Sequence, residues 1–178
     1  KHSAIDYTDV MPDSPTNNRP TFNFLLKDQR YSTSISNGNK TVEFIGANDS
    51  YSGVPITIYR DEGQAYCEIN LDFVYNGNSG DSHTVFVIGD NKDVSDIGSG
   101  DSSNYEGSYN SGGSSSAAAS INNSGVNQGT PTKFRTAGDR VGVYIDYDNG
   151  KGWFALNGTV QTVNGTPDIA NGTNPHFT

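Results

Sequence analysis

Two groups of acidic side chains are the first candidates for chemistry, because alternating oxygen donors in a loop suit a hard cation such as Ca²⁺. Asp146, Asp148 and Asn149 stand at such positions before Gly150. The Gly-x5-Glu remainder of a calcium hand is missing, so we interpret this segment as a strand end followed by a hairpin turn. The second group lies in a Gly/Ser-rich stretch and consists of Asp90, Asp93, Asp96 and Asp101. We interpret it as solvated loop carboxylates, with structural calcium as the alternative, and we expect no other cofactor.

A pair of carboxylates is also what glycoside hydrolysis requires, with the two groups about 5–9.5 Å apart. Glu68 lies on a predicted strand, with Asp72 or Asp146 as its partner. Such carboxylates are common on the polar face of a sheet. The histidines are scattered, and Cys67 alternates towards the predicted core, where thiols are usually inert. We therefore expect a protein that is not an enzyme.

Tyrosine combined with serine, glycine and asparagine is typical of adaptable binding loops, since tyrosine supplies rigid contact area at low entropic cost. Residues 91–129 and 47–53 have this composition. The candidate binding residues in them are Tyr105, Tyr109, Asn104, Asn110 and Tyr51. The alternative is that residues 89–129 form an exposed flap with short strands, in which Tyr105 and Tyr109 pack on their own sheet. We expect the only tryptophan, Trp153, in the core rather than on a sugar-stacking surface.

The elements that position these residues belong to one domain, because 178 residues suffice for one core and are few for two. Much of the polarity comes from Asn, Ser, Thr and Gly, which are poor helix formers. The formal charge of −9 repels phosphate backbones and anionic lipid, so neither nucleic acid nor membrane insertion is expected. Residues 1–24, which contain Pro12, Pro15 and Pro20, predict an irregular lead-in to a single domain over residues 25–178.

Short apolar alternations separated by turn residues predict strands throughout that domain. Asn37-Gly38, between the β-prone runs 32–35 and 40–45, predicts a hairpin, because these residues accept the positive φ of its turn. A second hairpin is predicted for 140–146 and 152–156, and the apolar run 84–88 is typical of a central strand. Further strands are predicted at 54–59, 65–75 and 159–163. The predicted fold class is all-β, an antiparallel two-sheet β-sandwich without substantial helix, with barrel closure as the alternative.

Four stretches of the sequence resemble a known family. GDRVGVYIDYD at 138–148, followed by WFALNG at 153–158, resembles the central signature of SPRY domains. GQAYCEI at 63–69 is similar to the strand usually written GKWYWEV in that family. VMPDSPTNN with TFN, within 10–23, and GTNPHFT at 172–178 are similar to stretches of SPRY-like modules in bacteriophage tail and fibre proteins.

The resemblance implies a concanavalin-like two-sheet sandwich that recognises a ligand rather than catalysing a reaction. It also implies a place on the virion, in a phage tail or on the capsid surface. The leading hypothesis is a structural and adhesion module of a tail fibre or spike, whose loops meet a host-surface glycan or protein. Other virion proteins are the further expected partners, and a homotrimer is left open.

Two alternatives to this function remain: a capsid-surface decoration protein, and a carbohydrate-binding module of a secreted bacterial enzyme. The resembled family also continues past the stretch at 172–178 into a last strand, which this chain lacks. The module is therefore expected to be either truncated or completed by another segment.

Overall fold

The computed structural model describes residues 20–23, 32–45, 54, 56, 62–72, 84–88, 107–111 and 118–178. Every regular element among these residues is a β-strand, which confirms the all-β prediction. The described residues contain no helix that is long and apolar enough to cross a membrane. Most of the predicted lead-in and of the predicted strand at 54–59 lies outside them.

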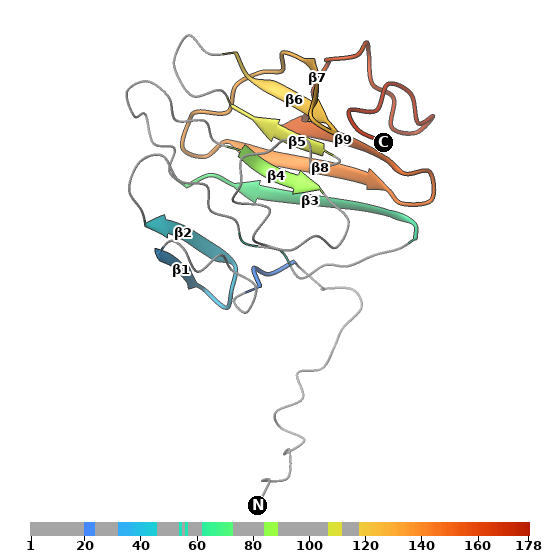
Figure 1. The fold of residues 1–178 in the computed structure, drawn as a ribbon. Coiled ribbons are helices and arrows are strands. Elements are labelled where there is room, and N and C mark those ends of the chain that lie inside the picture. Colours follow the sequence, from blue (N-terminus) through green and yellow to red (C-terminus); the bar gives the residue numbers. More distant parts are fainter. Residues whose placement is uncertain are drawn as a thin grey trace, which may run out of the picture.

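The strands form a hairpin and two four-stranded antiparallel sheets (Figure 1). The hairpin pairs β1 (Ser32–Ser36) with β2 (Thr41–Ile45). Sheet I, in the order β10-β9-β8-β3, consists of β3 (Gln64–Asn70), β8 (Arg140–Asp146), β9 (Lys151–Leu156) and β10 (Thr159–Val160). Sheet II, in the order β4-β5-β6-β7, consists of β4 (Thr84–Ile88), β5 (Gly107–Asn110), β6 (Ser120–Asn123) and β7 (Val126–Gly129).

The two sheets are layered and enclose one hydrophobic core. Residues two apart on a strand share a face, so Val141 and Val143 of β8 point the same way. Tyr109 of β5 and Ile121 of β6 meet them from sheet II. The buried members of the core are Tyr109, Ile121, Phe134, Val141, Val143, Phe154, Leu156 and Phe177. Residues from both sheets therefore share one core, as the predicted sandwich requires, and Figure 1 shows sheet II lying across sheet I.

Two Asn-Gly turns have the backbone geometry that these residues favour. Asn37 and Gly38, between β1 and β2, have φ of 55° and 62°. Asn157 and Gly158, between β9 and β10, have φ of 53° and 79°. Asparagine tolerates this left-handed region, and glycine has no Cβ to oppose it. The hairpin predicted at Asn37-Gly38 is therefore confirmed, as is the β8–β9 hairpin, and the turn at Asn157-Gly158 pairs β10 with β9.

Sheet II differs most from what the sequence predicts. The stretch 89–129, interpreted as a loop or exposed flap, supplies β5, β6 and β7 and so forms much of the second layer. Its small residues allow close packing, since a Cβ on Gly107 would lie 2.5 Å from the ring of Phe177. Within the part of the chain that the structure describes, β4 pairs with β5 alone and forms an edge, although a central strand is predicted. An apolar run indicates covered faces, and it does not require a neighbour on both sides.

The coil after β10 completes the edge of sheet I without a long strand. β10 ends at Val160, three residues earlier than predicted, and the carbonyl of Gln161 accepts a hydrogen bond from Nε2 of His176 at 2.8 Å. Phe177 forms a bridge with Gly152 of β9, and its ring occupies the space that a Cβ on Gly152 would need. This coil is therefore part of the packed sandwich.

Candidate functional site

The residues that resemble the SPRY signature form a structural clamp at the start of β8. Asp139 accepts hydrogen bonds from the backbone N–H groups of Arg135 and Thr136, both at 2.9 Å. It also accepts one from the side-chain amide of Asn157 at 3.1 Å, and Asn157 accepts one from the N–H of Arg140 at 2.9 Å. Desolvation raises the pKa of Asp139, but these hydrogen bonds outweigh it and hold that pKa below its ordinary value. The Asp and Asn of the motif thus join the turn before β8 to the turn after β9.

The candidate calcium segment at 146–150 is a hairpin turn whose carboxylates accept hydrogen bonds from amide groups. Asp146 accepts two from Asn149, one from the side chain at 3.0 Å and one from the backbone at 3.1 Å. Asp148 accepts one from the N–H of Gly63 at 2.8 Å. The bond from the Asn149 side chain is the main reason why the pKa of Asp146 lies below its ordinary value, although desolvation opposes it. The hairpin interpretation is confirmed, since β8 and β9 pair on either side of this turn.

The second acidic group, at residues 90–101, lies outside the described residues. In the portion that is described, no three His, Cys, Asp or Glu side chains gather in a way that would hold a metal ion.

The proposed hydrolase pair is too widely spaced along sheet I. Asp146 is the register partner of Gln64, and Glu68 lies four residues further along β3. Four residues of a strand span about 13 Å, which exceeds the ~5–9.5 Å that glycoside hydrolysis needs. Asp72 lies beyond the end of β3 and accepts a hydrogen bond from Asn70 at 2.6 Å. The geometry therefore gives no support to a catalytic pair of Glu68 and Asp146.

The outer face of sheet I carries a row of aromatic side chains across three strands. Tyr66 of β3 is the register partner of Tyr144 of β8, which is the partner of Trp153 of β9. Exposure falls along this row, from Tyr66 at 44% through the half-buried Tyr144 to the fully buried Trp153. The C-terminal coil covers the buried end, where the indole N–H of Trp153 donates to the carbonyl of Thr173 at 3.3 Å. Trp153 is thus buried as predicted, although beneath a coil and not between the sheets.

Tyr66 lies across β8 because that strand has a glycine beneath the ring. A Cβ on Gly142 would stand 2.5 Å from the phenol oxygen of Tyr66 and 2.8 Å from Cε2. The rings of Tyr66 and Tyr144 are 4.3 Å apart between centroids and tilted by 34°. At this distance the two rings are stacked and offset, because rings lying side by side in one plane cannot bring their centroids so close. The stacked pair forms an aromatic platform whose exposed ring is Tyr66, and the pairing of β3 with β8 holds both rings in place.

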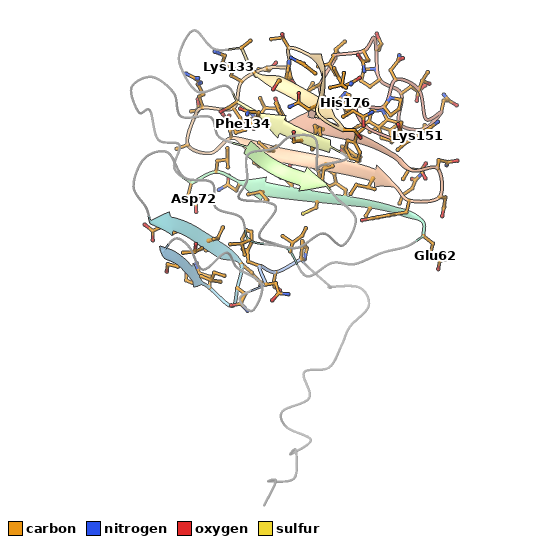
Figure 2. The ribbon with its side chains drawn as sticks, viewed as in Figure 1. Glu62, Asp72, Lys133, Phe134, Lys151 and His176 are labelled. Carbon is orange, nitrogen blue, oxygen red and sulfur yellow. The ribbon has the colours of Figure 1, made fainter. Side chains whose placement is uncertain are left out.

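An ion pair borders the aromatic platform. The phenol of Tyr66 donates to one oxygen of Glu68 at 2.6 Å, and Nη1 of Arg140 lies 3.3 Å from the other. Partial burial and the hydrogen bond to Glu68 raise the pKa of Tyr66, because both disfavour a phenolate beside a carboxylate. An exposed pair of this kind adds little stability, so its main effect is to orient the side chains. Figure 2 labels Glu62 and Asp72 at the two ends of β3, the strand that carries Tyr66 and Glu68.

Of the five candidate binding residues predicted to lie in loops, the structure describes two, and both lie on strand β5. Tyr109 is fully buried, packs edge to face on Phe134 at 5.0 Å and donates from its phenol to the carbonyl of Thr132. Its proposed role as a loop contact is therefore wrong, because a buried ring offers no area to a ligand. Asn110 lies at the end of β5 and is half-buried, so it belongs to a strand and not to a loop. The remaining candidates, Tyr51, Asn104 and Tyr105, lie outside the described residues.

Sequence reasoning missed two features. The first is the pairing of Tyr66 with Tyr144. Alternation with the core-facing Cys67 puts Tyr66 on the outer face, but its neighbour there depends on the β3–β8 register, which joins distant parts of the chain. The second is His176, one of the scattered histidines, which is 1% exposed and forms hydrogen bonds through both ring nitrogens. The only signal for it was its position between Pro175 and Phe177 in the GTNPHFT stretch.

No protein-family model matches this chain, and no curated protein is significantly similar to it. The motif resemblance to SPRY domains therefore remains a prediction.

Proposed function

We propose that this chain is a non-enzymatic structural and adhesion module of a bacteriophage virion, part of a tail fibre or spike. The proposal joins the motif resemblance to one observation, the aromatic platform of Tyr66 and Tyr144 with its oriented ion pair. Tyrosines on a rigid scaffold supply contact area without a large loss of conformational entropy. The polar residues of the SPRY-like motif, in contrast, bond to one another and support the fold.

In this function the sheet carries the recognition surface, and other virion proteins carry the module. Weak contacts from each copy add up where a fibre presents several copies together, as a homotrimer does. Of the stretches predicted as binding loops, 91–129 and 47–53, the parts 91–106 and 47–53 remain candidate contributors and lie outside the described residues.

A carbohydrate-binding module of a secreted bacterial enzyme is the second candidate function, because an exposed tyrosine stacked on a half-buried one also suits such a module. A capsid decoration protein has less support, since docking on a shell favours a broad apolar patch. Among the described residues, the large hydrophobic side chains that are exposed are Tyr66 on sheet I and Val126 on sheet II.

The test has two parts. The first locates the protein on the particle, and the second measures whether the purified chain competes with the particle for its host. Antibodies against the purified chain, viewed by electron microscopy on the particle that carries this gene, are expected to label the tail. An excess of purified chain is expected to slow adsorption of that particle to its host. Label confined to the capsid supports the decoration alternative, and absence of label from the particle contradicts the virion assignment.

A further inference from the structure

The strongest unassigned feature of the molecule is the aromatic platform on the outer face of sheet I. It is closed at one end, where Thr173 lies over Trp153, and open at the other, where Tyr66 is 44% exposed. Its rings come from neighbouring strands, so the distance and tilt between them are set by the β3–β8 register. A ligand that stacks here meets a surface that needs little reordering.

We propose that this platform binds a neutral pyranose unit of a host-surface glycan by stacking on the exposed ring of Tyr66, which Tyr144 supports from beside it, with Glu68 and Arg140 bonding to its hydroxyl groups. The proposal deepens the proposed function and rests on it, since it names the site and the class of ligand. A pyranose ring has one face rich in C–H bonds, and these carry the slight positive charge that an aromatic face attracts.

The ion pair beside the platform has the chemistry that sugar hydroxyls need. Each hydroxyl both donates and accepts, and Glu68 offers only acceptors whereas Arg140 offers only donors. Each carboxylate oxygen of Glu68 has one of these partners, Tyr66 or Arg140, but a carboxylate accepts about four hydrogen bonds. Arg140 is 52% exposed in its side chain and uses one of its nitrogens for Glu68. Donors and acceptors thus remain for two neighbouring hydroxyls.

Charge favours a neutral glycan over an acidic one. Glu68 and Arg140 neutralise each other at the platform, while the chain as a whole has a formal charge of −9. A field of that sign repels uronic and sialic acids during approach. Neutral hexose and N-acetylhexosamine units meet no such barrier.

The experiment measures binding of the purified full chain to immobilised neutral oligosaccharides of glucose, galactose, mannose, rhamnose and N-acetylglucosamine. Oligogalacturonate and sialyl-lactose are the acidic comparison. Wild type is expected to bind at least one neutral probe more tightly than either acidic one. Tyr66→Ala is expected to weaken that binding by about tenfold or more, because an aromatic anchor is lost. Tyr66→Phe keeps the ring and is expected to stay within about fivefold of wild type, the loss of one hydrogen bond.

Val126→Ala is the matched control, because it truncates a large hydrophobic side chain on sheet II that is also exposed. It is expected to leave binding unchanged, and melting curves verify that all variants fold. The proposal is overturned if wild type binds no neutral probe, if it prefers the acidic probes, or if Tyr66→Ala binds as well as wild type. Such a result with the particle still labelled at its tail would remove the platform proposal and leave the adhesion function standing.

Discussion

Acidification should destabilise this protein through His176, a residue buried at the edge of sheet I. Nδ1 accepts a hydrogen bond from the N–H of Phe154 at 2.8 Å, and Nε2 lies 2.8 Å from the carbonyl of Gln161. A backbone N–H can only donate and a carbonyl can only accept, so the imidazole is neutral with its proton on Nε2. A second proton on Nδ1 would break the bond to Phe154.

The size of the effect follows from the difference in pKa between the two states. Burial lowers the pKa of His176 from 6.5 to about 4, while the bond to Gln161 opposes the change. Between these values the unfolded chain holds a proton that the folded chain does not. Stability is therefore fully present above pH 6.5 and is lost as the pH falls towards 4. The free energy of unfolding decreases by about 1.4 kcal/mol per pH unit in that window, or about 2 kcal/mol between pH 7 and pH 5.

Urea unfolding at a series of pH values measures this dependence. The only tryptophan, Trp153, is fully buried, so its fluorescence reports unfolding. His176→Asn is the control, because its side-chain oxygen replaces Nδ1 as an acceptor and does not titrate in this range. The variant is expected to be less stable at pH 7 and to lose about 2 kcal/mol less than wild type on going to pH 5.

The carboxylates do not obscure this comparison. Asp139, Asp146 and Asp168 have pKa values below the ordinary 3.8, so the stability that they contribute is lost at lower pH than that of His176. If wild type and His176→Asn show the same slope between pH 7 and pH 5, the folded protein binds the proton freely and the reasoning is refuted.

Two further predictions concern packing, and both are measured by urea or thermal unfolding. Tyr109→Phe should lower the free energy of unfolding by about 1 kcal/mol, because the hydrogen bond to Thr132 is lost. Tyr109→Ala should lower it by about 3–5 kcal/mol, because the ring fills the core. Near-neutral results for both variants would contradict the burial of Tyr109. Gly152→Ala should cost about 1–3 kcal/mol because the new methyl group overlaps the ring of Phe177. In a Phe177→Ala background that cost should shrink, and an unchanged cost would mean that the two residues are not coupled.

The sequence predicts those parts of the fold that depend on short-range chemistry. Asn37-Gly38 favours a left-handed turn wherever it occurs, so the β1–β2 hairpin follows from six or so neighbouring residues. Alternation in β3 likewise predicts that Cys67 faces the core and Tyr66 does not, which the structure confirms. The pairing of β8 with β9 is equally local, because its turn lies between two apolar runs.

Sheet II, the aromatic platform and the role of His176 depend on contacts between residues that are distant in the chain. Such contacts cannot be predicted from the local pattern of a single sequence. The Gly/Ser composition around Tyr109 is that of a loop, but small residues also suit a strand packed closely on Phe177. The Tyr66–Tyr144 platform exists only in one register of β3 against β8, and a shift of β3 by one residue would place the two rings on opposite faces of the sheet. The role of His176 likewise depends on where β10 stops.

The position of Phe177 between Gly107 and Gly152 also determines when the molecule can fold. During synthesis, the β8–β9 ribbon is free to form as soon as it leaves the ribosome, but the space between the two sheets stays open until residue 177 has followed. We therefore expect the core to close only after residue 177 has been made, and until then the ring of Phe154 lacks its contact with Phe177. Closure across so long a loop is slow, and nascent chains stalled before this point are natural clients for chaperones.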